Sequence, residues 1–189
     1  MITTMFTFDP LAGTILEARQ VGSPNYDERP SGCLPELIVV HGISLPPGEY
    51  GGPWIDQLFT NCLPCNAHPY FEEIADLKVS SHFLVRRDGE LVQYVSVNRR
   101  AWHAGNSCYD GRECCNDFSI GIELEGADTE AYEPAQYACL AKLIATLKSE
   151  VKSLTQAAIV GHSDIAPGRK TDPGEAFEWG ELQRLLGGN

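Results

Sequence analysis

The chain has 189 residues, of which 43% are hydrophobic and 9% aromatic, which is enough apolar material for one sizeable core. Its formal net charge of −12 gives no cationic field to attract nucleic acid or anionic lipid, so we expect neither as a partner. No stretch reaches the roughly 18 apolar residues of a membrane span, and the first ten residues lack the basic and apolar regions of an export signal. We therefore expect one monomeric domain over 1–189, with its core over about 23–179, in the cytoplasm.

Four segments of the chain carry strand patterns. The run "PELIVVHG" (35–42) is continuously apolar and predicts a strand buried on both faces, with His41 at its end. Two β-rich runs flank Asp88-Gly89 within 80–97, which predicts an antiparallel hairpin. In "FSIGIELEG" (118–126) the apolar residues alternate with Gly121, Glu123 and Glu125, so the two carboxylates share one face of a strand. "AAIVGH" (157–162) predicts a short strand that ends at His162.

Two segments carry helical patterns. Tyr137, Leu140, Ile144 and Leu147 recur at helical spacing in an amphipathic segment over 133–151, and a second helix is expected over 175–186. Mixed strands interleaved with helices predict an α/β domain with a partly antiparallel central sheet flanked by helices.

Seven cysteines, an odd number, are expected to remain thiols in a cytoplasmic chain, without a disulfide framework. Cys62 and Cys65 form a "CLPC" pair that is similar to a redox motif. Because no thioredoxin-like βαβ pattern surrounds the pair, we do not interpret it as a redox site.

The residues that carry metal chemistry lie at the ends of two predicted strands. His41 and His162 each end an apolar run and precede a Gly/Pro-rich loop. A catalytic zinc site needs three protein ligands and one open position. Asp172 is the attractive third ligand because it lies in the stiff "RKTDPG" turn, and Asp164 is its rival; spacing alone does not separate the two. His82 and His103 also remain candidates from the residues alone.

Six motifs, in order, resemble those of the AmpD-type zinc amidases, the cytoplasmic anhydro-muramyl-alanine amidases of cell-wall recycling. They cover about 23–179 and read "LIVVHGISLPPGEYGGPW", "AHPYFEEI", "SSHFLVRRDGELVQYV", "RAWHAG", "CNDFSIGIELEG" and "GHSDIAPGRKTDPG". The wider family includes phage amidase lysozymes and peptidoglycan recognition proteins. The resemblance implies a mixed α/β fold of that type, with Zn²⁺ as the cofactor and an anhydro-muramyl peptide as the substrate.

Carried over by position, the resemblance implies metal ligands at His41, His162 and Asp172. It also implies a general base at Glu123 and a lysine that stabilises the transition state at Lys170. Glu125 lies on the same predicted strand face and is the alternative base.

Trp102 and His103 are expected either to form a wall for the substrate or to support the site from behind. Substrate contacts are also expected at Gly42, Arg86 and Arg112, because arginine forks suit carboxylates. Asn is usual in the family at the position of Gly42, so recognition of the muropeptide is expected to differ there.

Three other classes of protein stay open on the sequence. A peptidoglycan-binding module of the same fold would bind without cleaving, a metal-dependent deacetylase would release acetate, and a cysteine enzyme would respond to thiol alkylation. The presence of all five implied positions favours the amidase.

Overall fold

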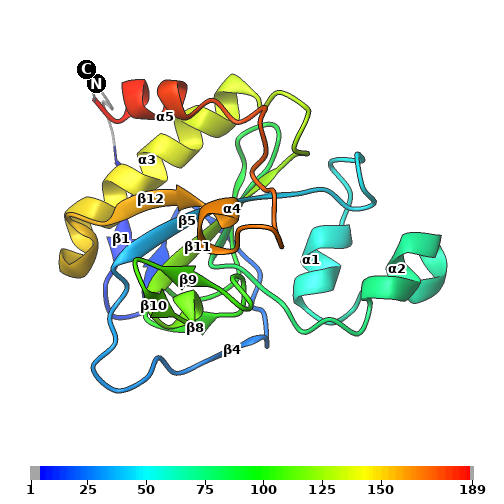
Figure 1. The fold of residues 1–189 in the computed structure, drawn as a ribbon, viewed down its shortest axis with the longest axis horizontal. Helices are drawn as coiled ribbons and strands as arrows, with labels where there is room; N and C mark the ends of the chain where they lie inside the picture. The colour runs from blue at the N-terminus through cyan, green and yellow to red at the C-terminus, as the bar shows by residue number, and fades with distance from the viewer. Residues whose placement is uncertain (1–4, 188–189) are drawn as a thin grey trace.

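A six-stranded mixed sheet forms the centre of the computed structural model, which describes residues 5–187 (Figure 1). The strand order is β12-β5-β11-β6-β7-β3. Strands β12, β5, β11 and β6 are parallel to one another, and β7 returns antiparallel to β6. The expected mixed sheet is therefore confirmed. Its strands are β3 (Arg19–Gln20), β5 (Leu37–Ile43), β6 (Phe83–Val85), β7 (Leu91–Gln93), β11 (Ser119–Glu125) and β12 (Ala158–Gly161).

Short antiparallel pairs of strands border this sheet. They are β1 (Phe8–Asp9) with β2 (Thr14–Ile15), β4 (Tyr26–Asp27) with β8 (Arg100–Ala101), and β9 (Cys108–Tyr109) with β10 (Arg112–Glu113).

Helices cover both faces of the sheet. α3 (Pro134–Glu150) and α5 (Trp179–Leu185) pack on one face in a core shared with the apolar row of β11. α1 (Trp54–Phe59), α2 (Pro69–Ile74) and α4 (His162–Ile165) pack on the other face in two smaller cores. In Figure 1, α1 and α2 stand at one side of the molecule. The functional side chains lie on the face that carries α4.

The alternation in β11 decides which face each side chain meets. Ile120, Ile122 and Leu124 enter the core beneath α3, so Glu123 must face the opposite side. Glu123 pairs in register with His41 on the parallel strand β5. Because paired residues of neighbouring strands point to the same face, the two side chains are placed side by side.

Most expected elements are confirmed, with shifts at their ends. His41 is the fifth residue of the seven-residue β5 rather than its last, and α3 and β12 are each shorter by one residue at both ends than expected. α5 begins only at Trp179, because Phe177 is buried against Tyr132 and Tyr137 and holds the preceding loop. α1 and α2 were not predicted, since each has only six residues.

Over residues 5–187 no helix is both long and apolar enough to span a bilayer. All seven cysteines are unpaired in the structure, and both Cys62 and Cys65 are exposed.

Candidate active site

Three potential metal ligands converge in one small volume at the end of β5. The Nδ1 atoms of His41 and His162 are 2.9 Å apart. Asp172 Oδ2 lies 3.0 Å from Nδ1 of His162 and 3.3 Å from Nδ1 of His41. The structure therefore brings together the three residues that the resemblance implied as ligands.

The topology explains this convergence. β5 and β12 are adjacent and parallel, so their carboxyl ends meet at the same edge of the sheet. His41 lies near the end of β5, and His162 follows directly on β12 as the first residue of α4. The loop after α4 folds back, and Asp172 O accepts a hydrogen bond of 3.0 Å from Ser163 N.

The hydrogen bonds of His162 determine which of its nitrogens is available. Its Nε2 faces the carbonyl oxygen of Ala104 at 3.2 Å, and a carbonyl can only accept. Arg169 Nη2 also lies 3.4 Å from Nε2, but its two protons are directed at carbonyl oxygens, those of Ala104 at 2.6 Å and Asn106 at 2.7 Å. Nε2 therefore carries a proton, which leaves Nδ1 as the nitrogen that can offer a lone pair. That lone pair points at a carboxylate oxygen, an arrangement that is favourable only with a shared proton or a cation between them.

The protonation of the cluster suits a cation. Burial lowers the pKa of His41 to about 4, so this imidazole is neutral at pH 7. Burial raises the pKa of Asp172, but its close contacts with the imidazoles of His162 and His41 outweigh burial and hold the pKa well below its usual value. Two imidazoles and one carboxylate are a common ligand set for catalytic zinc.

The spacing of the three atoms also suits zinc. With ligand distances of about 2.0 to 2.1 Å, neighbouring atoms of a tetrahedral zinc site are about 3.3 Å apart. The observed separations are 2.9, 3.0 and 3.3 Å. The residues present therefore fit the ion with little adjustment.

The rival ligands have other functions. Asp164 Oδ2 accepts a hydrogen bond of 2.7 Å from Gly161 N at the start of α4. His82 is fully buried, accepts from Gly121 N at 3.0 Å through Nδ1, and directs Nε2 at Arg99 O. Asp164 and His82 therefore hydrogen-bond to the backbone and are not part of the cluster of candidate ligands.

Glu123 is the buried carboxyl nearest in register to the cluster. It is 8% exposed, and its Oε2 has no hydrogen-bond partner. Burial, reinforced by the charge of Asp172, raises the pKa of Glu123 well above its usual value, although the charge of Lys170 opposes the shift. A carboxyl with a raised pKa and a free oxygen has the properties of a general base.

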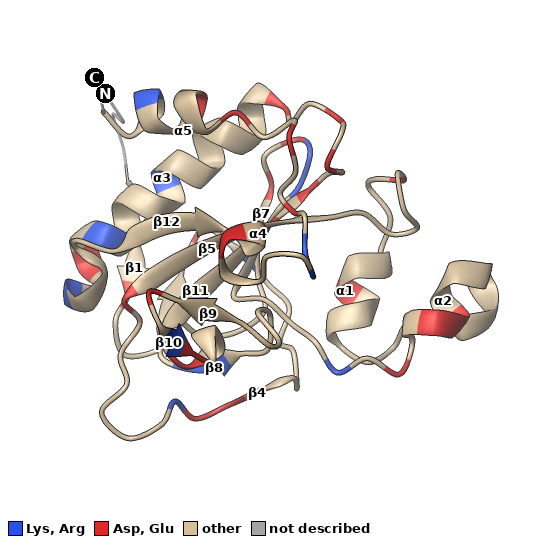
Figure 2. Ribbon diagram, viewed as in Figure 1, with Lys and Arg blue, Asp and Glu red and all other residues tan. Residues whose placement is uncertain are grey.

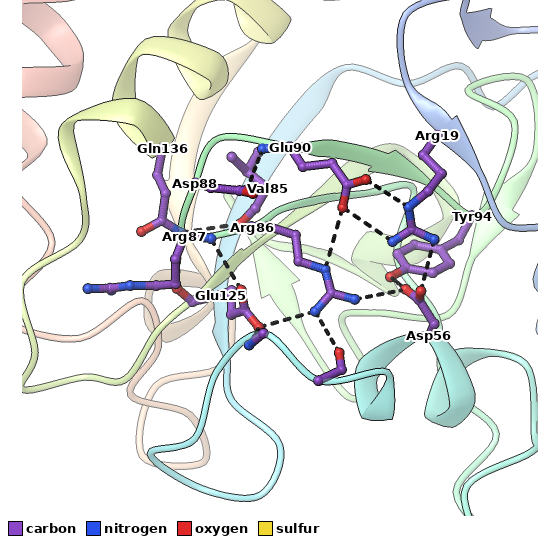
Figure 3. A network of polar contacts seen from close by, with 12 residues as sticks. Arg19, Asp56, Val85, Arg86, Arg87, Asp88, Glu90, Tyr94, Glu125 and Gln136 are labelled. Atoms are coloured by element: carbon purple, nitrogen blue, oxygen red, sulfur yellow. Dashed lines mark hydrogen bonds and ion pairs between the residues drawn. The ribbon is translucent and has the colours of Figure 1, made fainter.

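Glu125, two residues further along the same strand, has a different environment. Its Oε1 accepts from Gly51 N at 2.7 Å and from Arg86 at 3.2 Å, and its Oε2 accepts from Arg87 N at 3.2 Å. Figure 3 shows this carboxylate inside a network of polar contacts. Both of its oxygens are used in holding the structure, which leaves Glu123 as the candidate base.

A cavity of about 530 Å³ opens over the cluster. Its polar end includes the three candidate ligands with Glu123, His103 and the exposed Lys170. Its other wall is largely apolar and comes from α1, α2 and the segment after α2, with Leu58, Phe59, Tyr70, Ile74, Leu77 and Val79. Sequence reasoning missed this apolar wall, and its only local signal was the periodicity of "PYFEEI".

Comparison with known proteins identifies the family. Residues 31–175 match the model of the N-acetylmuramoyl-L-alanine amidases. This chain belongs to that family. It is 58% identical over 177 residues to the 1,6-anhydro-N-acetylmuramyl-L-alanine amidase AmpD of Salmonella typhimurium (strain SL1344), with 94% of each chain covered.

Solved structures agree with this assignment. The crystal structure of a selenomethionine AmpD derivative matches with a TM-score of 0.91 and 57% identity, covering 95% of this chain and 99% of that one. A more distant match is Escherichia coli AmiD in complex with anhydro-N-acetylmuramic acid-L-Ala-D-γ-Glu-L-Lys. It has a TM-score of 0.56 and 27% identity, and the match covers 86% of this chain and 62% of that one.

The amidase cavity includes two of the five residues that were expected to contact substrate, Gly42 and His103. At Gly42 a Cβ would lie 2.4 Å from Tyr132 Oη, so no side chain fits there while Tyr132 keeps its place. His103 presents little surface, being 8% exposed, and its two ring nitrogens face His41 and Ser119.

The other three expected contacts lie outside this cavity. Arg86 is buried beside Glu125 and Asp56 (Figure 3). Trp102 is half-buried, and its backbone N–H donates to Ser80 Oγ at 3.1 Å. Arg112 is exposed, pairs with Glu36 at 2.7 Å and stacks over Phe118.

Proposed function

We propose that this amidase uses zinc to hydrolyse the amide bond between the lactyl group of 1,6-anhydro-N-acetylmuramic acid and L-alanine, in the cytoplasmic recycling of cell-wall fragments. The observation that carries the proposal is the convergence of His41, His162 and Asp172 next to the unpartnered carboxyl of Glu123. The names of the relatives support the substrate, because AmpD is an anhydro-muramyl-L-alanine amidase and AmiD is seen with an anhydro-muramyl peptide.

His41, His162 and Asp172 would hold the zinc ion. When bound, zinc supplies a Lewis acid that makes a water nucleophilic near neutral pH and polarises an amide carbonyl. The candidate ligands are buried or half-buried and all come from one chain, so the site needs no second copy of the protein.

Glu123 accepts the proton of the attacking water at its carboxylate, which lines the cavity, and then delivers it to the leaving amine of L-alanine. Its raised pKa suits both steps, since a carboxyl with a pKa closer to neutral is a better base and can also return the proton.

Lys170 would stabilise the negative charge that develops on the carbonyl oxygen as the tetrahedral intermediate forms. It lines the cavity on the same loop as Asp172, with its ammonium free to approach the substrate from the exposed rim. Contributions of this kind are worth about 3 kcal/mol.

The test is to incubate the purified, zinc-loaded protein with anhydro-muramyl-L-Ala-D-γ-Glu-L-Lys and identify the products by mass spectrometry. The proposal expects a free tripeptide and anhydro-N-acetylmuramic acid. Release of acetate would identify a deacetylase, and binding without any product would identify a non-catalytic module of the same fold.

Parallel assays test the preference for the anhydro sugar. The same peptide on ordinary N-acetylmuramic acid is expected to react more slowly, and intact sacculi slowest of all. Equal rates on the two fragments would leave a general muramyl-alanine amidase, and rapid release of peptide from sacculi would point to a wall-lytic enzyme.

A further inference from the structure

His103 lines the cavity and also makes a direct contact with the candidate ligand His41. His103 Nδ1 lies 2.9 Å from Nε2 of His41, the nitrogen that faces away from the cluster. The ring of His103 sits directly on Gly121, where a Cβ would come within 2.4 Å of Cγ of the ring. The His103 ring can occupy this position only because Gly121 of β11 has no side chain.

The direction of the hydrogen bonds around His103 can be assigned from its far end. Ser119 Oγ is 2.5 Å from the carbonyl oxygen of Cys115, which can only accept, so the hydroxyl donates its single proton there. Ser119 Oγ must then accept at its 3.1 Å contact with Nε2 of His103. His103 therefore carries its proton on Nε2 and a lone pair on Nδ1.

That lone pair assigns the proton of His41. Because Nδ1 of His103 can only accept in this form, Nε2 of His41 donates, which leaves Nδ1 of His41 as the nitrogen that can bind a cation in the cluster. The order of donation is His41 to His103 to Ser119 to the Cys115 carbonyl. All three side chains are buried, so water does not compete for these bonds.

Ala104, the residue after His103, orients the second imidazole, that of His162, in the same way. Ala104 O accepts from Nε2 of His162. The N–H groups of His103 and Ala104 both donate to Oδ1 of Asn116, at 3.1 and 2.8 Å, which fixes the dipeptide in place. One clamped dipeptide thus contacts the outward nitrogen of both histidines.

We propose that His103 is a positioning residue: with Ser119 behind it, it holds His41 in the tautomer whose Nδ1 can bind the metal, while Ala104 does so for His162. The role is separate from contact with substrate. It rests on the proposed function only in taking His41 as a metal ligand.

The first test observes the tautomer directly in the metal-free protein. Long-range ¹H–¹⁵N NMR correlations of selectively labelled histidines are expected to show His41 protonated on Nε2 in the wild type. In Ser119→Ala and His103→Leu, His41 is expected to lose this single form. A wild-type His41 protonated on Nδ1 would overturn the proposal, whether or not the protein proves to be a zinc amidase.

The second test measures zinc affinity by competition with a chromophoric chelator. Loss of a group that orients a ligand typically weakens metal binding about 10- to 100-fold, so His103→Leu is expected to fall in that range and Ser119→Ala to move in the same direction. His103→Asn keeps an oxygen at the place of Nδ1 and is expected to recover part of the loss. An unchanged affinity in both His103→Leu and Ser119→Ala would overturn the proposal.

Thr146→Ala is the matched control for Ser119→Ala. Thr146 is also a fully buried hydroxyl that donates to a backbone carbonyl, Lys142 O at 2.8 Å, but it lies on α3 across the sheet. Its loss is expected to lower stability without changing the zinc affinity or the tautomer of His41. Comparable loss of affinity in Thr146→Ala and Ser119→Ala would show a general effect of stability and contradict a positioning role. Failure of the wild type itself to bind zinc would contradict the proposed function while leaving the NMR result to stand alone.

Discussion

Two glutamates on one strand face, two residues apart, have opposite environments. Glu123 lines the cavity and has one oxygen without a partner, whereas Glu125 is held by Arg86 and by two backbone N–H groups. Burial is similar for both, at 8% and 2% exposed, so the difference comes from their partners. A buried carboxyl without partners reduces stability, and functional sites are where such groups persist.

Glu123→Gln is expected to lose about 100- to 10,000-fold in turnover, because the variant keeps the shape of the side chain but cannot transfer a proton. Zinc content measured by elemental analysis should stay unchanged. Turnover comparable to that of the wild type would show that another residue acts as the general base.

The same substitution is expected to stabilise the metal-free protein at pH 7. Burial raises the pKa of Glu123, so between the unfolded value near 4.5 and the higher folded value the folded state holds a proton that the unfolded chain has released. Rising pH therefore destabilises the wild type through this window, and glutamine removes the effect. Urea unfolding at pH 5 and pH 7 checks this, with the advantage of Glu123→Gln growing at the higher pH. Glu125→Gln, which weakens a paired carboxylate, is the matched control and is expected to destabilise.

Asp172 and Asp164 provide a second comparison at the residue scale. Asp172→Ala is expected to abolish zinc binding, since it removes the only carboxylate of the candidate ligand set. Asp164→Ala should keep about one zinc per chain and lose only about 1 kcal/mol of stability, the usual value of an N-terminal helix cap. Elemental analysis of both purified variants measures the zinc content per chain. Full zinc content in Asp172→Ala would refute the ligand set.

At the scale of elements, a polar network fastens α1 to the sheet. Asp56 of α1 accepts from Arg19 at 2.9 Å, from Arg86 at 3.3 Å and from Tyr94. Arg86 also donates to Gly52 O, in the loop before α1, and to Glu125. Figure 3 shows Arg86 between the two carboxylates. Because α1 forms part of the apolar wall of the cavity, this network positions the substrate site from outside it.

Arg86→Leu is expected to destabilise the fold by about 3 to 5 kcal/mol, because it leaves the buried Glu125 without its charged partner. Arg19→Ala breaks ion pairs at a residue whose side chain is 39% exposed and is expected to cost at most about 1 kcal/mol. Urea denaturation of the two variants measures the difference. Equal losses would contradict the central place of Arg86 in the network.

At the scale of the whole molecule, negative charge dominates. Figure 2 shows acidic residues spread over helices and loops on several sides of the ribbon. With a net charge of −12, repulsion between like charges destabilises the folded chain. A cation bound by the cluster of His41, His162 and Asp172 would reduce this net charge. Metal binding and overall stability are therefore expected to be linked.

Removal of zinc is expected to lower the melting temperature. A ligand at 100 times its Kd stabilises the folded state by about 2.7 kcal/mol, which for a chain of this size corresponds to about 5 to 10 °C. Differential scanning calorimetry with zinc and with a chelator checks this. Asp172→Ala should show no difference between the two conditions, and an equal response in that variant would place the stabilising zinc elsewhere.

The sequence by itself determined the elements whose patterns are local. The alternation of Ile120, Ile122 and Leu124 placed Glu123 on the opposite face, and helical periodicity located α3 to within a residue at each end. The family motifs also named the residues that the structure brings together. Only the tertiary structure placed Asp172 rather than Asp164 in the cluster, and left an oxygen of Glu123 rather than of Glu125 without a partner, because each environment depends on contacts from distant segments. The apolar wall over α1 and α2, and the contact of His103 with His41, were likewise beyond the sequence, since they depend on how separate elements pack rather than on the pattern within any one of them.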